Sequence, residues 1–424
     1  MESSKKRSRI FQLFAVIYFP FVYFGQLSMS SSFVISQSAD GIVNYLGAFF
    51  NLVALFFLLT KTKGKVSIAS NRWVVAVVVW FLLAFFNSLI NATDVGRAFK
   101  DFNYGTLWCT HLLLYYYLSR NGYLNSKRFL LVFVFLIVFS AIMTFRLFNA
   151  FVFDNGGLVA MGFNAVYFVV CLMPWAFLVE KKWLKIALIA LVSLAVVFSQ
   201  KRTAIVALAL QLLIFLITNL KTKKIFTIKL VGTIILAVVF VYAFISVDQN
   251  YLNGGVTKRF EKAESDNYGN RFMIWEDLFE KYDNSNVYYK LFGHGCESFR
   301  SSSRYHLTAH NDYLETLYDY GLVSLIVLFM FLVFLTGKIK RILNNNRQIG
   351  VAYLTSLTAF FTLTTSSHLL FIHPCAIVFI TCIWGYSIGR VEYDNDLLIA
   401  NIRNLNSVQN EIDKKSKRIS LESC

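Results

Sequence analysis

The chain has 424 residues, of which 57% are hydrophobic and 17% aromatic, while only 15% are charged. A soluble fold lacks the interior to bury so much apolar surface, so the composition excludes a soluble globular protein, a disordered chain and a small disulfide scaffold. It favours an all-α polytopic integral membrane protein, because a helix satisfies its own backbone hydrogen bonds in lipid. The formal net charge is +17. Lys and Arg residues are distributed unequally between the two sides of a membrane, so their positions must be assigned before the charge is used to infer partners.

Runs of about 20 mostly apolar residues predict the transmembrane helices. About twelve such runs occur, at 10–35, 42–60, 73–90, 102–118, 129–147, 157–179, 184–199, 203–219, 226–247, 316–336, 349–366 and 371–389. The first run follows a basic segment but is too long for a signal peptide and lacks a cleavage site, so we expect it to be retained.

These runs divide the chain into four parts. Residues 1–247 hold helices one to nine, 248–311 form one large polar loop, 312–389 hold helices ten to twelve, and 390–424 form a mixed-charge tail that we expect to be a loose helix. A long connection with its own structure is usually functional. We therefore expect the active residues in and around the large loop.

Basic residues set the orientation of the predicted bundle. Most of the 41 Lys and Arg residues fall in the segments on the same side as the N-terminus, which predicts that both termini are cytoplasmic. The large loop then faces outward. The positive charge is mainly a topology signal and an attraction to anionic lipid, and it gives no reason to expect nucleic acid.

The outer loop contains a predicted amphipathic helix over residues 271–282. Its aromatic and aliphatic side chains recur at a spacing of three to four residues, and they are Phe272, Trp275, Leu278, Phe279 and Tyr282. We expect this face to lie on the bilayer surface or on the other helices.

Cations on the outer side depart from the general charge pattern and are the candidates for chemistry. They are Arg146 at the end of the fifth helix, Lys201 and Arg202 in a tight hairpin, Arg271 at the start of the loop helix, and His310 before the tenth helix. A cation at a membrane boundary is costly unless a partner or a ligand neutralises it. All five are predicted in one interfacial layer.

Structural roles are open for several of these cations. Arg146 could snorkel from its helix end, Lys201 could be an interfacial anchor, and Arg271 could pair with a glutamate close to it in sequence. His310 could belong to a helix cap made with its neighbour Asn311. Arg202 has no carboxylate near it in sequence, which favours a functional role.

The remaining candidate ligands form no recognisable motif. The six cysteines make no CxxC pair, and the predicted outer face has no Asp-x-Asp, so we expect neither a metal nor a cofactor. His111 lies in an apolar run and is interpreted as a core residue. Four other histidines lie on the outer side without a usable context, namely His294, His306, His368 and His373.

The segment Ala309–Gly321 resembles a signature of the bacterial O-antigen ligase and surface polysaccharide polymerase superfamily. His310, Asn311 and Gly321 fit the family spacing, whereas the second glycine of that pattern is absent because Ser324 and Leu325 stand there.

Two more segments resemble the same superfamily. Residues 200–203 match its short outer hairpin with an arginine, and Arg271 with Trp275, followed by Leu291–Gly295, match an outer-loop pattern. The resemblance covers roughly residues 195–366.

The resemblance implies a bacterial inner-membrane glycosyltransferase that moves an undecaprenyl-pyrophosphate-linked glycan at the periplasmic face. An arginine fork suits pyrophosphate oxygens, and a histidine can take the proton of an acceptor hydroxyl. We therefore expect a metal-independent, inverting enzyme. The expected catalytic residues are His310, Arg202 and Arg271, and the expected substrate-binding residues are Lys201, Asn311, Arg146 and Trp275.

The acceptor remains open at this point. A polymerase would use a lipid-linked glycan and a ligase would use the lipid A core, and we favour the polymerase slightly. Other expected partners are membrane lipid, a chain-length regulator and a flippase. A transporter is a weaker alternative, because the predicted helix centres almost lack ionisable residues, and a structural or sensor protein would need no outer arginines.

Overall fold

The computed structural model describes residues 18–29, 33–61, 72–92, 94–124, 127–154, 164–199, 201–219, 271–370 and 374–422. Within these residues the chain is helical and contains no strand, as the composition predicts. After a first helix over residues 18–28 come α2 (Phe33–Lys61), α3 (Arg72–Asn91), α4 (Val95–Arg120), α5 (Lys127–Asp154), α6 (Val166–Phe177), α7 (Lys182–Phe198), α8 (Arg202–Asn219), α11 (Arg271–Asn284), α12 (Val287–Phe292), α13 (Ser298–Ser302), α14 (Asp312–Glu315), the π-helical turn η2 (Thr316–Tyr320), α15 (Gly321–Thr336), α16 (Ile339–Asn345), α17 (Arg347–Ser366) and α18 (Pro374–Glu422).

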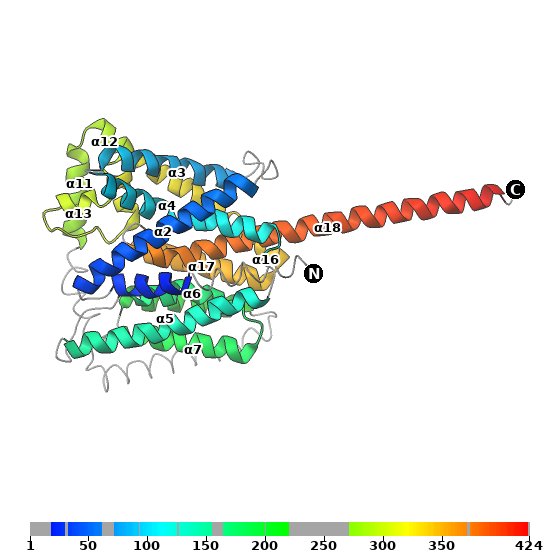
Figure 1. Ribbon diagram of the computed structural model, residues 1–424, viewed down its shortest axis with the longest axis horizontal. Helices are drawn as coiled ribbons and strands as arrows, with labels where there is room; N and C mark the ends of the chain where they lie inside the picture. Colours follow the sequence, from blue (N-terminus) through cyan, green and yellow to red (C-terminus); the bar gives the residue numbers. More distant parts are fainter. Residues whose placement is uncertain are drawn as a thin grey trace.

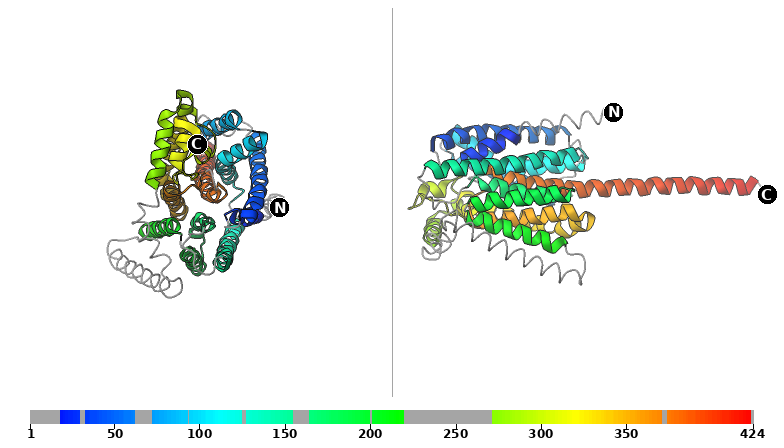
Figure 2. Two further views of the ribbon diagram at one scale, coloured as in Figure 1. Left: turned by 90° about the vertical axis from the view of Figure 1, so that its left-hand side faces the viewer. Right: turned by 90° about the horizontal axis from the view of Figure 1, so that it is seen from below.

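The long helices run roughly along one direction and form a bundle with two different ends (Figure 1, Figure 2). The short helices α11, α12 and α13 cover one end, and α18 leaves the bundle at the opposite end as a long projecting helix (Figure 1). The described part of the large loop and the projecting end of α18 therefore lie at opposite ends of the bundle (Figure 1). Which end faces the cytoplasm stays a prediction.

Five helices in the described ranges are long and apolar enough to cross a membrane. They are Arg72–Asn91, Phe129–Asn149, Asp312–Asn345, Arg347–Ser366 and Pro374–Ser407. Two shorter apolar helices, Val166–Phe177 and Arg202–Thr218, accompany them. The count of twelve spans is not confirmed, and the predicted span at 226–247 lies outside the described residues.

Two predicted boundaries are wrong. Residues 36–41, expected to connect the first two spans, are helical because α2 already begins at Phe33. The polar Asp40 is tolerated in this helix because it pairs with Lys100 and Tyr104 of α4. The tail does not begin as a separate element at 390, since α18 continues without a break to Glu422.

The first part of α18 is enclosed by the other helices of the described bundle. Every side chain from 374 to 389 is buried, and the helix packs mainly on α4. Gly385 and Gly389 face the α4 backbone at Leu112 and Tyr116, where an added Cβ would overlap main-chain atoms. Small residues four apart allow this close approach, as in many membrane helix pairs.

A second, smaller core holds the outer helices together. Ile274 and Leu278 of α11 pack with Phe299, Ala309 and Tyr318. The predicted amphipathic helix therefore exists, but its apolar residues divide into two sets. Leu278 is buried and Trp275 and Tyr282 are partly buried in this core, whereas Phe272 and Phe279 are exposed.

Candidate active site

The connection between α7 and α8 brings two cations to the loop-bearing end of the bundle. The Lys201 N–H donates to Ser199 Oγ at 3.3 Å, and α8 begins at Arg202. Both cationic side chains are partly buried there. The Lys201 ammonium lies 5.6 Å from the ring centroid of Tyr167, a cation–π contact that anchors it beside the hairpin. Gln200, the first residue of the matched motif, lies outside the described residues.

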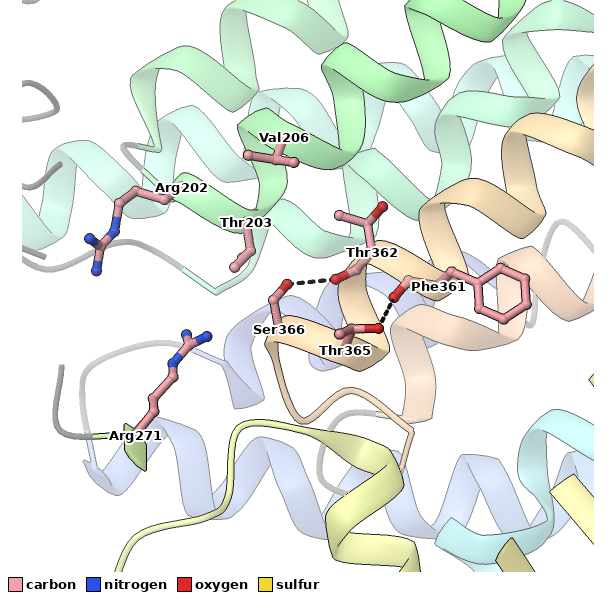
Figure 3. Close-up of a pocket in the computed structure, with 8 residues that line it drawn as sticks. All are labelled: Arg202, Thr203, Val206, Arg271, Phe361, Thr362, Thr365 and Ser366. Atoms are coloured by element: carbon pink, nitrogen blue, oxygen red, sulfur yellow. Dashed lines mark hydrogen bonds between the residues drawn. The ribbon is translucent and has the colours of Figure 1, made fainter. Parts of the chain in front are cut away.

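Arg202 and Arg271 line the same pocket although 69 positions separate them in the sequence. Arg202 comes from the start of α8 and Arg271 from the start of α11, and both guanidinium groups extend toward the space between these helices (Figure 3). The pocket has a volume of about 500 Å³. Its other lining residues are Thr203 and Val206 of α8 and Phe361, Thr362, Thr365 and Ser366 of α17.

Among the described residues, the lining of this pocket contains two arginines and no carboxylate. The ion pairs found in the described chain do not include one between Arg271 and Glu276, and Glu264 lies outside the described residues. Burial lowers the pKa of Arg271, and the positive charge of Arg202 lowers it further, while Tyr167 acts in the opposite direction. Two cations held this close destabilise one another, so an anion bound between them is favoured.

A chain of hydrogen-bonded hydroxyl groups lies beside the pocket. The Tyr167 hydroxyl lies 2.7 Å from Thr203 Oγ1 and accepts a hydrogen bond from Ser367 Oγ at 3.0 Å. This chain of hydroxyls ties the start of α8 to the end of α17. It holds Arg202 in place relative to the α17 wall.

Trp275 fixes the segment that precedes His310. Its indole Nε1–H donates to the carbonyl of Ala309 at 2.7 Å, and its ring packs on the small outer core. Trp275, which we expect to contact substrate, therefore also has a structural role. It connects α11, which begins with Arg271, to the backbone directly before His310. A direct contact of Trp275 with substrate stays a prediction.

His310 forms a pair with His368, a residue without any sequence signal of its own. The two Nδ1 atoms lie 2.8 Å apart, and the Thr308 hydroxyl lies 3.2 Å from the same nitrogen of His368. His310 has a positive φ of 52°, a conformation in which His, Asn and Asp are enriched among non-glycine residues. This backbone conformation places the ring against His368.

Burial and two cationic neighbours favour the neutral form of His310. Burial, followed by the charges of Arg271 and Lys201, lowers the pKa of His310 from 6.5 to about 4. Lys201 and Arg271 therefore act electrostatically on His310. At neutral pH the imidazole is unprotonated, which is the state in which it can accept a proton.

Asp312 holds the two histidine-bearing segments together. Its Oδ2 accepts hydrogen bonds from the N–H groups of Leu369 and Leu370, both at 3.1 Å, directly after His368. Asp312 is fully buried, and Glu315 is 3% exposed. Both carboxylates thus serve the backbone around the site, and neither lines the arginine pocket.

Asn311 is the N-cap of α14. Its Oδ1 accepts from the N–H groups of Tyr313 at 3.0 Å and Leu314 at 3.2 Å. The helix-cap interpretation therefore applies to Asn311, while the ring of His310 contacts His368. The expected contact of Asn311 with a sugar hydroxyl stays a prediction.

Arg146 is exposed on α5 and is not among the residues that line the pocket of Arg202 and Arg271. The described structure therefore does not bring it together with Arg202 and Arg271. Its expected role in substrate binding stays a prediction.

The two glycine-containing motifs contact one another. Gly293 and Gly321 have φ values of 84° and 83°, and a Cβ on either would overlap the backbone of the other segment, at Asp319 or Leu291. His294 N–H also donates to the Tyr318 carbonyl at 3.1 Å. The glycines thus allow the α12 segment to dock on the π-helical turn η2, a kind of bulge common near functional sites.

Sequence reasoning missed His368, Thr308 and the Tyr167–Thr203–Ser367 hydroxyl chain. The only available signal for His368 was its place just beyond a predicted span on the outer side. No group of three or more His, Cys, Asp or Glu in the described ranges is arranged to hold a metal ion. Metal independence stays a prediction.

Comparison with known proteins agrees with this geometry. Residues 186–330 match the family described as O-antigen ligase, a stretch that includes Arg202, Arg271 and His310 but not Arg146 or His368. A search of the curated proteins found no match to the chain. Over residues 186–330, about a third of its length, this membrane protein is similar to the O-antigen ligase family.

Proposed function

We propose that this protein is a glycosyltransferase that moves an undecaprenyl-pyrophosphate-linked oligosaccharide onto a glycan acceptor at the periplasmic face of the bacterial inner membrane. We propose further that it acts as a repeat-unit polymerase. The observation that carries the proposal is the pair Arg202 and Arg271, which line one pocket without a carboxylate and lie beside a neutral His310.

The arginine pocket suits the donor's pyrophosphate and the start of its lipid chain. A guanidinium donates two parallel hydrogen bonds to phosphate oxygens, and two guanidiniums offset the two charges of a lipid-linked pyrophosphate. Val206 and Phe361 supply apolar wall in the same pocket. The pocket therefore combines anion recognition with contact to hydrocarbon.

The arginines act on the leaving group. As the bond from the anomeric carbon to the phosphate oxygen breaks, the electron pair stays with the lipid pyrophosphate, which gains one negative charge. Preorganised cations that meet this developing charge lower the barrier. A direct displacement by the acceptor hydroxyl inverts the anomeric centre.

His310 accepts the proton of the acceptor hydroxyl. For Nε2 to carry the lone pair, the hydrogen must be on Nδ1, and His368 Nδ1 at 2.8 Å is placed to accept it. His368 is thus a positioning residue that aims the basic nitrogen of His310 toward substrate.

A transfer assay with purified protein tests the proposal. The donor is the host's own lipid-pyrophosphate-linked repeat unit, and the product is read as longer lipid-linked glycan. We expect turnover in the presence of a chelator, loss of turnover in Arg202→Ala and Arg271→Ala, and normal amounts of both variants in the membrane. Full activity of both variants would place the pyrophosphate elsewhere, and strong inhibition by the chelator would contradict metal independence.

The acceptor is tested in a strain that lacks the protein. Loss of glycan chain length, with single units still attached to the cell surface, supports a polymerase. Loss of attachment to the lipid A core would assign the ligase reaction instead, with the same donor and the same residues.

The orientation is tested with single cysteines and a membrane-impermeant thiol reagent. We expect labelling of a cysteine placed at 285 in cells with a permeabilised outer membrane, and no labelling of one placed at 65. The reverse pattern would overturn the proposed topology.

A further inference from the structure

A second pocket, which we name the Asp40 pocket, opens beside the catalytic histidine. It has a volume of about 390 Å³, and its lining comes from the first helix, α2, α4, the segment 297–310 and the segment after α17, namely Ser28, Asp40, Lys100, Tyr104, Glu297, Arg300, His306, Leu307, Thr308, His310 and His368. His310 lines this pocket and is also close enough to Arg271 to be affected by its charge. Ser366 lines the arginine pocket and His368, two residues further on, lines the Asp40 pocket together with His310, so the two pockets approach one another at this point.

The charges of the two pockets differ. The arginine pocket has two cations in its lining, whereas the Asp40 pocket balances two carboxylates, Asp40 and Glu297, against two cations, Lys100 and Arg300. A balanced lining rich in donors and acceptors suits a neutral ligand with many hydroxyl groups. An anionic lipid pyrophosphate is favoured in the arginine pocket instead.

Hydrogen bonds preorganise the polar wall of the Asp40 pocket. The Tyr104 hydroxyl donates to Asp40 Oδ1 at 2.7 Å, and Lys100 Nζ lies 3.6 Å from Asp40 Oδ2. The Asp40 side chain nevertheless keeps 37% of its surface exposed, so its oxygens can accept further hydrogen bonds. Tyr104 is buried at 3% exposure and cannot move away without disturbing α4.

Glu297 is fixed in a comparable way. Its Oε2 lies 3.3 Å from Arg97 Nη2, and its side chain is 15% exposed. Arg97 also donates to the carbonyl of Cys296 at 2.8 Å, so the backbone that carries Glu297 is tied to α4. Two carboxylates that are held by different elements and line one pocket can accept hydrogen bonds from the hydroxyls of a single sugar ring.

We propose that the Asp40 pocket binds the terminal sugars of the acceptor glycan and presents one of their hydroxyl groups to His310. The inference rests on the proposed function and adds the place and chemistry of the acceptor site. Asp40 and Glu297 accept hydrogen bonds from acceptor hydroxyls, and Tyr104 positions Asp40. Binding on this side leaves the arginine pocket to the donor.

Kinetics with separate variation of the two substrates tests the proposal. The acceptor probe is the oligosaccharide released by mild acid from the host's own lipid-linked repeat unit, and the donor is the intact lipid-linked unit. Loss of a hydrogen bond to a carboxylate weakens binding by about tenfold or more. We therefore expect Asp40→Ala to raise the acceptor KM by about tenfold or more, with a donor KM close to that of the wild type.

Tyr104→Phe provides a second, milder variant. It keeps the buried ring and removes only the hydroxyl that orients Asp40, so we expect a smaller rise of the acceptor KM and an unchanged donor KM. Asp283→Ala is the matched control, because Asp283 is an exposed carboxylate at the end of α11 that lines neither pocket. Its two KM values should equal those of the wild type.

Binding of the same oligosaccharide to purified protein, measured by saturation-transfer NMR, gives a readout that needs no turnover. Binding to the wild type that weakens in Asp40→Ala and Tyr104→Phe supports the acceptor site. Wild-type acceptor KM and binding in both variants would overturn it. A rise of donor KM instead of acceptor KM would also overturn it, by assigning the pocket to the donor.

The two proposals fail in different ways. If the wild-type protein transfers no glycan but binds the oligosaccharide at Asp40, the proposed function fails and the sugar site stands. If transfer depends on Arg202 and Arg271 but is indifferent to Asp40 and Tyr104, the function stands and the acceptor site fails.

Discussion

His310 and His368 are hydrogen-bonded through their Nδ1 atoms at 2.8 Å, across 58 positions of sequence. Only one of the two nitrogens can carry the shared hydrogen, so this single contact sets opposite tautomers in the two rings. Asp312 stabilises the arrangement, because it accepts from the backbone of Leu369 and Leu370 next to His368. The histidine pair is thus part of the packing between α14 and the end of α17.

Removal of the His310 imidazole should abolish turnover while donor binding persists. A general base contributes about 10²- to 10⁴-fold in rate, so His310→Ala should lose at least about a hundredfold in single-turnover transfer. Asn tolerates the positive φ of this position, so His310→Asn separates loss of the base from backbone strain. Donor binding and transfer are measured on one preparation, and near-normal transfer in both variants would assign the base elsewhere.

Replacement of His368 should act on the orientation of His310. His368→Ala removes the acceptor for the His310 Nδ1 hydrogen, so we expect kcat to fall by about tenfold or more with little change in donor KM. His368→Asn offers an amide oxygen near the former Nδ1 and should restore most of the rate. Equal losses of kcat in the two variants, with unaltered pH profiles, would reduce His368 to a packing residue.

The arginine pair should require the guanidinium and not only its charge. Arg202→Lys and Arg271→Lys should lose about 10²-fold or more in transfer, because a point charge cannot make the bidentate contact with phosphate. Arg341→Ala, an exposed arginine of α16 at the opposite end of the bundle, is the control and should transfer normally. Wild-type rates in both Lys variants would mean that charge alone suffices.

The pH profile should depend on Lys201. Its positive charge disfavours protonated His310 and lowers the pKa of that residue, which stands at about 4. Lys201→Gln removes this repulsion, so the pKa rises and the acid limb of kcat/KM moves to higher pH. In the wild type, the negative charge of the bound donor also raises the pKa of His310. The acid limb of kcat, which reports the complex with donor, should therefore lie at higher pH than that of kcat/KM, which reports the free enzyme. An unchanged acid limb in Lys201→Gln would show that another group controls it.

The docking of α12 on the π-helical turn should fail without Gly321. Its φ of 83° strains any L side chain, and a Cβ there would overlap the Leu291 carbonyl. We expect Gly321→Ala to lower the melting temperature in detergent and to increase proteolysis within residues 285–310. Gly337→Ala is the matched control, since a Cβ at Gly337 meets no atom closer than 3.5 Å. Equal stability of the two variants would contradict the role assigned to Gly321.

Some features followed directly from the sequence because they depend on local composition. Apolar runs had to be helical, since a helix closes its own hydrogen bonds in lipid, and α3, α5 and α17 lie close to the predicted ranges. The motif residues Arg202, Arg271 and His310 were identified from chemistry and from the family resemblance. The start of α2 was not predicted, because a polar residue such as Asp40 is typical of a loop. Its partners Tyr104 and Lys100, which stabilise it within the helix, are known only from the structure.

The tertiary structure alone decided which of these residues lie close together. It brings Arg271 to Arg202, pairs His310 with His368 and leaves Arg146 on an exposed surface. Such distances depend on how helices far apart in the sequence pack, and on backbone contacts such as those of Asp312 with the segment after His368. A hydropathy pattern gives the element that carries a side chain and the end on which it lies, but the pocket that the side chain enters is set by long-range packing.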